Sequence, residues 1–252
     1  MINAVITRNK RLNGTTFDTF EYFYRLWELD KSIKLVSETD NFNPDFLNKK
    51  YEIDNSCFNN IIIDKPENLK YNNVLAFDVF QWMESNIECN NFYLMNNDKV
   101  FPKYQKNVKY FDEYDTFRNY IYKIYYQIQK IYEHKERTYI KCFDFNIDVY
   151  KIIKKYKNVI ITEKNNYIPY TELKNFIGDF FKNFNKFVYI KYGSFYDRHP
   201  RIYLECANQG IDCEYINLTP EIDNGYFRYK DRFDFEKRNI KKDKILEEFL
   251  EL

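Results

Sequence analysis

Acidic and basic side chains gather in one short segment, residues 191–217, in a pattern that suits a phosphorylated sugar. Asp197 and Glu205 are separated by seven residues, and Pro200 lies between them. Proline is favoured in the first turn of a helix, where its missing N–H has no partner. The free amides of such a turn attract phosphate, and Arg201 would add a positive charge. The two carboxylates could accept hydrogen bonds from sugar or ribose hydroxyls.

The residues around these acids extend the candidate site. Gly193 and Ser194 directly follow a predicted buried strand at residues 187–190, and Arg198 and His199 lie in the loop after them. His199 is a candidate to contact phosphate or a leaving group, although a single loop histidine is more often only solvated. No motif selects among the basic candidates for a diphosphate, which are Arg137, Lys141, Arg198 and Arg201.

A second group of candidates lies near the amino terminus. Gly14 stands in a polar turn between a predicted strand at residues 4–6 and a predicted helix at residues 15–29. Asp18, in the first turn of that helix, is a candidate general base for an acceptor hydroxyl. An aspartate there can equally serve the helix dipole. We expect an acceptor to bind around residues 11–18.

Strands and helices alternate along most of the chain, and this alternation must position the candidates. Apolar runs predict strands at 4–6, 32–36, 61–63, 74–77, 92–95, 108–111, 139–143, 159–161, 187–190 and 213–216. Helical periodicity predicts helices at 15–29, 79–83, 114–133, 148–156, 169–181, 200–209 and 235–250. Such an order predicts βαβ units and parallel sheets, whose ligands bind where the strands end. Residues 37–70 give no prediction beyond the strand at 61–63.

The predicted fold class is therefore α/β, with two Rossmann-like domains facing a cleft. A charged stretch at residues 133–137 marks the junction between them. The expected division is an amino-terminal acceptor-side domain at residues 1–134 and a nucleotide-sugar-binding domain at residues 135–232. The last helix, at residues 233–252, is expected to brace the amino-terminal domain.

The composition restricts the class of protein. The formal net charge is +1, so the whole molecule has no field that would hold DNA or an anionic membrane by charge alone. The aromatic share of 20%, with only 5 glycines, is first a sign of AT-rich coding, and a dedicated aromatic surface is the alternative. No run of about 18 uncharged apolar residues occurs, and the amino terminus has no secretory pattern. We expect no membrane span and a cytoplasmic protein, in the host cytoplasm if it is viral.

Motifs for metals and cofactors are also missing from the sequence. The 5 cysteines show no C-x-x-C spacing and there are 2 histidines, which makes a zinc site hard to build and predicts free thiols. The sequence has no P-loop, no G-x-G-x-x-G and no Asp-x-Asp at a predicted strand end. We therefore expect metal-independent chemistry with no cofactor.

Residues 197–216 resemble the carboxy-terminal signature of glycosyltransferases with the two-Rossmann (GT-B) fold. That signature has an acid, seven residues, then Glu, followed by Gly and a strand; here these are Asp197, Glu205, Gly210 and residues 213–216. Residues 168–173 (IPYTEL) also resemble the family's Pro-Tyr-x-Glu-Leu helix start. The likeness covers about residues 160–220. It implies that Asp197 contacts the donor sugar and that Glu205 holds the ribose. The chain departs from the pattern in three ways. Its first acid is Asp rather than Glu, the sequence DRHPR stands where the family has a Gly-rich stretch, and the family's Arg/Lys pair is missing.

The resemblance implies a hexosyltransferase that moves a sugar from a nucleoside diphosphate sugar, with UDP expected, to an acceptor hydroxyl. Residues 228–244 hold eight basic and four acidic side chains with aromatics between them. Such a run is usually a solvated helix face but also suits nucleic acid. Because the chain is similar to bacteriophage glycosyltransferases, a hydroxymethylated base in phage DNA is one acceptor hypothesis. The alternatives are a generic Rossmann-like domain, a non-catalytic sugar-nucleotide-binding protein and a nucleic-acid-binding accessory protein.

Overall fold

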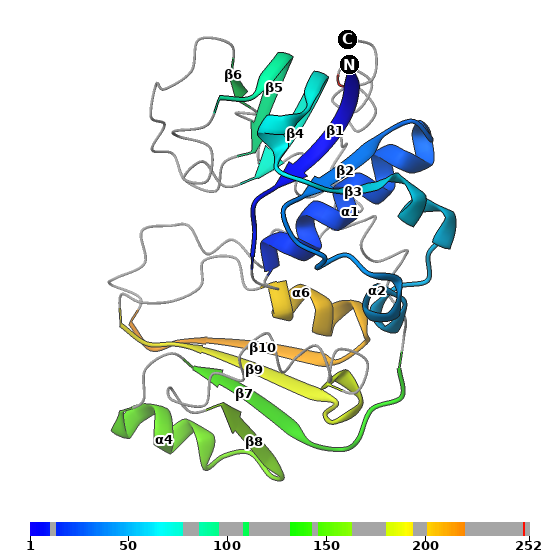
Figure 1. Ribbon diagram of the computed structural model, residues 1–252. Helices are drawn as coiled ribbons and strands as arrows, with labels where there is room; N and C mark the ends of the chain where they lie inside the picture. Colours follow the sequence, from blue (N-terminus) through cyan, green and yellow to red (C-terminus); the bar gives the residue numbers. More distant parts are fainter. Residues whose placement is uncertain are drawn as a thin grey trace. The chain divides into compact units, whose positions relative to one another are not determined.

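The computed structural model describes residues 1–10, 14–77, 86–95, 108–110, 132–142, 146–162, 180–193, 201–219 and 249 (Figure 1). The chain divides into two compact units. Unit 1 comprises Met1–Ile128 and Phe235–Leu252, and unit 2 comprises Gln129–Asp234. The helix predicted at 79–83, residues 114–131 of the helix predicted at 114–133, residues 169–179 of the helix predicted at 169–181, and all but residue 249 of the helix predicted at 235–250 lie outside the described residues.

Unit 1 is built on a parallel sheet that has six strands among the described residues. They are β1 (Ile2–Thr7), β2 (Lys34–Ser37), β3 (Ile61–Ile63), β4 (Lys70–Phe77), β5 (Glu88–Met95) and β6 (Val108–Tyr110). Their order is β3-β2-β1-β4-β5-β6, and each neighbouring pair is parallel. This is the strand order of doubly wound nucleotide-binding folds, in which the order reverses between β1 and β4.

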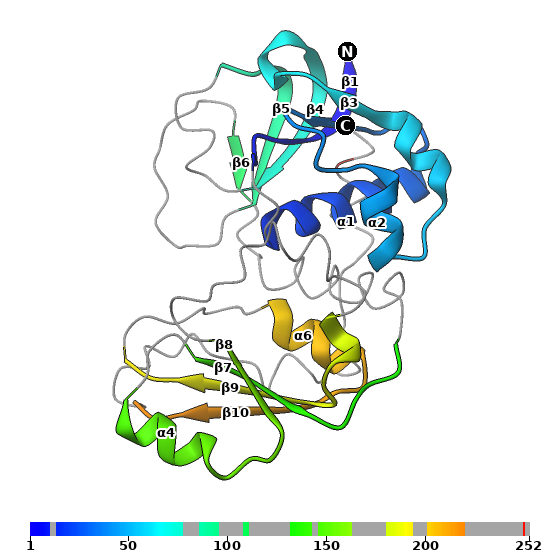
Figure 2. The ribbon, with the colours of Figure 1, turned by 60° about the horizontal axis from the view of Figure 1, so that its bottom comes forward.

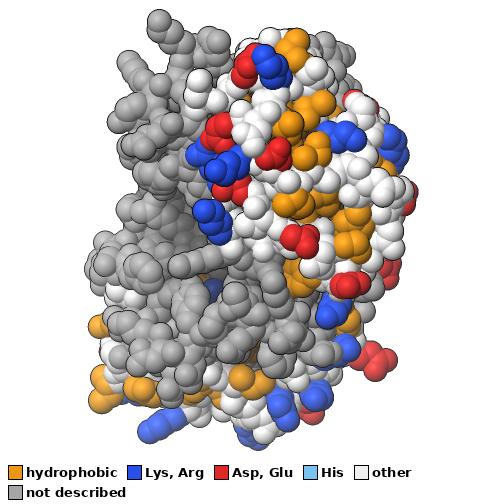
Figure 3. All heavy atoms as spheres, viewed as in Figure 1, with side chains coloured by type: hydrophobic (Ala, Val, Ile, Leu, Met, Phe, Trp, Pro, Cys, Tyr) orange, Lys and Arg blue, Asp and Glu red, His pale blue; other side chains and the backbone are white. Residues whose placement is uncertain are grey.

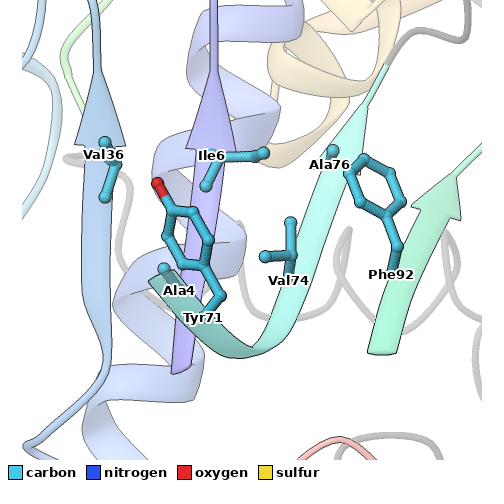
Figure 4. Close-up of a cluster of buried hydrophobic side chains, with 7 residues drawn as sticks. All are labelled: Ala4, Ile6, Val36, Tyr71, Val74, Ala76 and Phe92. Carbon is cyan, nitrogen blue, oxygen red and sulfur yellow. The ribbon is translucent and has the colours of Figure 1, made fainter. Parts of the chain in front are cut away.

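The central strands of unit 1, β1, β2 and β4, are buried on both faces. Figure 4 shows one face of the sheet, where seven apolar side chains form a cluster: Ala4, Ile6, Val36, Tyr71, Val74, Ala76 and Phe92. On the alternate positions Val5, Leu35 and Leu75 are also at most 1% exposed. A parallel sheet covered on both faces explains why these strands are continuous apolar runs in the sequence.

Helix α1 (Gly14–Leu29) follows β1 and contacts β1, β2 and β4. Its Phe20 also stacks on Phe42, Tyr51 and Phe58, at ring-centroid distances of 5.7–6.3 Å. The stacked residues belong to the segment for which the sequence made no prediction. That segment forms α2 (Pro44–Lys50), the 3-10 helices η1 (Asn55–Asn60) and η2 (Pro66–Asn68), and β3. Figure 2 shows α2 beside α1.

A buried asparagine in β4 fixes Phe249 to unit 1. The Asn73 side chain is fully buried; its Nδ2 donates to the backbone oxygen of Phe249 at 3.0 Å, and its Oδ1 accepts from Asn91 Nδ2 at 2.9 Å. The Phe249 ring lies edge-on against Tyr93, with centroids 5.6 Å apart. Residues 176 positions apart in the chain are thus joined in the core of one unit.

Unit 2 is built on a second parallel sheet, with four strands among the described residues. They are β7 (Thr138–Cys142), β8 (Val159–Thr162), β9 (Lys186–Lys191) and β10 (Asp212–Asn217), in the order β10-β9-β7-β8. The order reverses between β7 and β9. Both units are therefore α/β with parallel sheets, as expected from the sequence, and the layout is compatible with two Rossmann-like domains.

Two helices cover opposite faces of the unit 2 sheet. Helix α4 (Ile147–Ile153) begins at Asn146, whose side chain accepts a hydrogen bond from Val149 N, and it packs on the face that carries Ile140 and Val188. Helix α6 (Arg201–Asn208) contacts β9 and β10. Its Tyr203 ring lies edge-on against Phe187, which points to the other face because side chains alternate along a strand.

We expect the substitution Asn73→Leu to destabilise unit 1 by about 2–4 kcal/mol, because it leaves the Phe249 oxygen and the Asn91 amide without their buried partner. Urea unfolding followed by the fluorescence of the buried Trp27 measures this. The matched control is Asn72→Leu on the same strand, where the bond to Asn90 is exposed, and we expect a loss below about 1 kcal/mol. Equal losses for the two variants would contradict the anchoring role of Asn73.

Candidate functional site

The loops after β9 and β10 form one hydrogen-bonded group at the carboxyl edge of the unit 2 sheet. Lys191 ends β9, and its backbone oxygen accepts from Leu218 N at 2.9 Å. Gly193 N donates to Thr219 Oγ1 at 3.0 Å, and Thr219 N donates to Asn217 Oδ1 at 3.0 Å. Gly193 has a φ of +75°, in the region that glycine adopts most readily. Ligands of open parallel sheets bind at this edge, next to the point where the strand order reverses.

Lys191 is fully buried at this edge. Its Nζ donates to the backbone oxygen of Thr219 at 3.4 Å. A buried ammonium group loses its hydration and needs hydrogen bonds and opposite charge around it. The sequence pattern predicted the strand at 187–190 but not a role for the lysine that ends it. The sequence signal that could have identified Lys191 is a charged residue directly after an apolar strand.

Lys141 lies near Lys191 on the neighbouring strand. Lys141 pairs with Tyr189 in the β7–β9 register, so Lys191 is two positions further along β9 and on the same face. This is the face that α6 covers, because Tyr139 stacks on Phe187 and Phe187 contacts Tyr203. The two strands flank the reversal of strand order, so both lysines lie beside that reversal, towards the carboxyl edge of the sheet.

Glu205 lies on α6, over the same face of the sheet, and is 5% exposed. The pKa of the neighbouring Cys206 thiol shows which charged groups lie near this part of α6. Burial raises the pKa of the Cys206 thiol, as does a hydrogen bond with Cys213; the negative charge of Glu205 raises it further and the positive charge of Lys141 lowers it. Lys141 and Glu205 therefore act on the same buried thiol. A ribose hydroxyl reaches the Glu205 carboxylate only if the residues that cover it move.

The remaining candidates from unit 2 fall largely outside the described residues. Arg201 is the first residue of α6, but its side chain is outside the described part. The others outside it are Ser194, Asp197, Arg198 and His199, together with residues 168–173 and 228–244. The structure brings together Gly193, Lys141 and Glu205 in one unit, and the roles of the others stay predictions.

The candidates in unit 1 lie on α1. Gly14 is its first residue, and Asp18 is a half-buried residue one turn further on. The structure adds residues that the sequence pattern missed at the carboxyl ends of β1 and β2. Arg8 pairs with Glu67, and its Nε lies 3.5 Å from Glu38 Oε1. Figure 3 shows acidic and basic side chains interspersed on the visible described surface of unit 1.

The loop after β1 is fixed by the loop after β2. The backbone oxygen of Asn9 accepts from Asn41 Nδ2 at 3.0 Å and from Thr39 Oγ1 at 3.3 Å. Asn9 follows β1 as a polar residue in the sequence, and its hydrogen-bond partners Thr39 and Asn41 come from the loop about 30 residues further on. The described edge of unit 1 thus pairs acids with bases and amides with backbone oxygens, and it offers polar groups for a hydroxylated ligand.

No family model matches the chain, and comparison with curated proteins and with solved structures gives no match. Among the described residues, no three His, Cys, Asp or Glu side chains lie together as a metal site would require, and metal independence stays a prediction. In the described part of the chain, no helix has the length and apolar character to cross a membrane.

The hydroxyl of Thr219 holds the Gly193 amide, and we expect Thr219→Val to free it. An amide that loses a part-buried acceptor is destabilised by about 1–2 kcal/mol, which makes exchange roughly five to thirty times faster. Hydrogen–deuterium exchange of the peptide that covers residues 191–193 measures this. Thr219→Ser, which keeps the hydroxyl, is the matched control and should exchange like the natural protein. Fast exchange in both variants, or in neither, would contradict the link.

Proposed function

We propose that this protein is a nucleotide-sugar-dependent glycosyltransferase of the GT-B type, in which unit 2 holds the donor and unit 1 the acceptor. The observation that carries the proposal is the position of Lys141 and Lys191. Two lysines on neighbouring parallel strands flank the reversal of strand order, where such sheets bind phosphorylated ligands. A nucleoside diphosphate sugar has the charge that this pair would neutralise.

In the proposed complex, Lys141 and Lys191 bind the diphosphate once the groups that cover the fully buried Lys191 move, and the pair takes the place of the family's Arg/Lys motif that the sequence lacks. Glu205 on α6 accepts hydrogen bonds from the ribose hydroxyls once its cover opens. Asp197 contacts the sugar hydroxyls, and Arg201, Arg198 and Ser194 lie around the phosphates. The role of Asp197 comes from the sequence resemblance, and those of Arg201, Arg198 and Ser194 come from their places in the sequence, after the predicted strand at 187–190 or at the start of the predicted helix at 200–209.

The proposed reaction is a displacement at the anomeric carbon. The acceptor hydroxyl gives its proton to Asp18, its oxygen bonds to the anomeric carbon, and the bond from that carbon to the phosphate oxygen breaks. Negative charge grows on the departing diphosphate, and the two lysines stabilise it where it develops. Holding donor and acceptor in line supplies much of the remaining rate gain. His199 is the candidate for a further contact to the leaving phosphate.

The acceptor is proposed to be a hydroxylated molecule, with a hydroxymethylated DNA base as one candidate. An enzyme that glycosylates a base in duplex DNA must take the base out of the stack. The polar edge formed by Arg8, Glu38, Asn9 and Thr39 is the described part of unit 1 that offers hydrogen bonds to such a hydroxyl.

A non-catalytic sugar-nucleotide-binding protein is the second candidate function. The sequence lacks the family's Arg/Lys pair that neutralises the departing diphosphate, and this favours a protein that binds the donor without transferring its sugar. The two candidates share the donor site and differ in the chemistry that follows binding.

We expect Lys191→Met to weaken UDP binding by tenfold to about a hundredfold, because a charge-assisted hydrogen bond contributes about 1.5–3 kcal/mol. Isothermal titration calorimetry with UDP measures the affinity, and Lys141→Met should behave alike. The matched control is Lys151→Met on α4, on the other face of the sheet, where the lysine is exposed and pairs with Asp148. If the natural protein does not bind UDP, or if all three variants bind it equally well, the donor site proposed at Lys141 and Lys191 is wrong.

Slow donor hydrolysis should accompany binding if the protein is an enzyme. With a UDP-hexose and no acceptor, we expect release of free sugar, followed by nuclear magnetic resonance of the anomeric proton. Glu205→Gln keeps the shape of the side chain, and we expect it to slow the release at least about tenfold, the effect of losing one charged hydrogen bond. Binding without any sugar release by the natural protein would favour the non-catalytic candidate.

A further inference from the structure

Two thiols of unit 2 meet between α6 and β10. Cys206 on α6 is fully buried, and Cys213 on β10 is half-buried. The Cys213 Sγ lies 3.7 Å from the backbone oxygen of Tyr203 and 3.3 Å from that of Ile211. A helical side chain covers the turn that precedes it, so the Cys206 side chain lies over residues 202 and 203. The Cys213 sulfur therefore reaches the part of α6 that the Cys206 side chain occupies.

The electrostatics of Cys206 agree with this geometry. Burial is the largest cause that raises the pKa of its thiol, and the next is a hydrogen bond with the Cys213 side chain. This agrees with the position of the Cys213 sulfur against the turn of α6 that precedes Cys206. The raised pKa also means that Cys206 is protonated at neutral pH and that its thiolate fraction grows as the pH rises.

The short connection between the two cysteines is held by backbone hydrogen bonds. Ile211 N donates to the oxygen of Cys206 at 3.0 Å, and Gly210 N donates to the oxygen of Ala207 at 3.0 Å. Gly210 has a φ of +73°, which suits a glycine that ends a helix. The His134 ring also lies 2.8 Å from the oxygen of Gln209, so this end of α6 is fixed from a second side.

We propose that Cys206 and Cys213 form a dithiol pair that a low-molecular-weight disulfide oxidises to an intramolecular disulfide. The more accessible Cys213 attacks one sulfur of the small disulfide, which releases one small thiol and leaves a mixed disulfide on Cys213. Cys206 then attacks the Cys213 sulfur, which releases the second small thiol. The two protein thiols give up two electrons and two protons, and the small disulfide is reduced to two thiols.

The bond would fasten α6 to the strand beneath it. Glu205 directly precedes Cys206, so the disulfide restrains the helix turn that carries this carboxylate. The inference itself does not depend on the proposed function, because it concerns only the two thiols and their neighbours.

The sequence provides a direct readout. Trypsin cleaves after Arg201 and next after Arg228, and the resulting peptide holds Cys206, Cys213 and no other cysteine. The reduced full-length protein is incubated with oxidised glutathione, quenched in acid, alkylated in denaturant, digested and weighed by mass spectrometry. We expect this peptide to be two hydrogens lighter and free of alkyl groups, and dithiothreitol should restore both alkylation sites. The reaction should be faster at higher pH.

Two variants separate the steps. Cys206→Ala should stop at the mixed disulfide, so that the peptide carries one glutathione on Cys213. Cys213→Ser should leave the buried Cys206 unmodified until the protein is denatured. If a variant does not fold, the mass of the oxidised peptide from the natural protein tests the proposal by itself. A natural-protein peptide with two alkyl groups, or with two glutathione groups, after oxidation would overturn the proposal.

Discussion

Parallel pairing of the strands is the constraint on which the rest of this structure depends. Each described strand of both units runs parallel to its neighbours, so the chain must cross back over a sheet face before it adds the next strand. The crossovers bury both faces of the central strands. The side chains of Lys191, Arg8, Asn9 and Thr219 lie at or just after the carboxyl ends of strands, and the sheets bring these residues, distant in sequence, to one edge within each unit.

The proposed function of this edge depends on the burial of Lys191. Taking a lysine out of water is costly by several kcal/mol per ion, and an apolar side chain of similar volume is often as stable or more stable in such a position. Places where a chain departs from the most stable choice are commonly functional. A fully buried lysine next to Lys141, at the reversal of strand order, fits a site whose ligand brings negative charge.

Much of the fold could be predicted because its signals are local. The apolar runs at residues 4–6, 139–142 and 187–190 are strands, and the helix predicted at residues 15–29 is α1, because buried parallel strands and an aromatic helix face leave clear periodicities. The segment at residues 37–70 could not be predicted, since its short helices are stabilised by rings that stack on Phe20 from far along the chain. The helix propensity of the local sequence does not reveal contacts with distant residues.

The candidate site could be predicted only in part. Gly193 is at a positive φ at the end of a strand, as a glycine in that place suggests, and Lys141 is at the carboxyl edge of β7. The burial of Glu205 and Lys191 could not be read from the sequence, because it depends on how α6 and the loops after β9 and β10 pack. Asp197, Arg198, His199 and Ser194 are outside the described residues, so their roles stay predictions.

Hydrogen–deuterium exchange of the full-length protein, with and without UDP, tests the central claim most directly. If the carboxyl edge of unit 2 holds the nucleotide diphosphate, UDP slows exchange at residues 191–193 and 217–219, because a ligand that binds there lowers the population of the open form. If saturating UDP leaves these amides unchanged, or slows exchange only in unit 1, the donor site assigned to Lys141 and Lys191 is wrong.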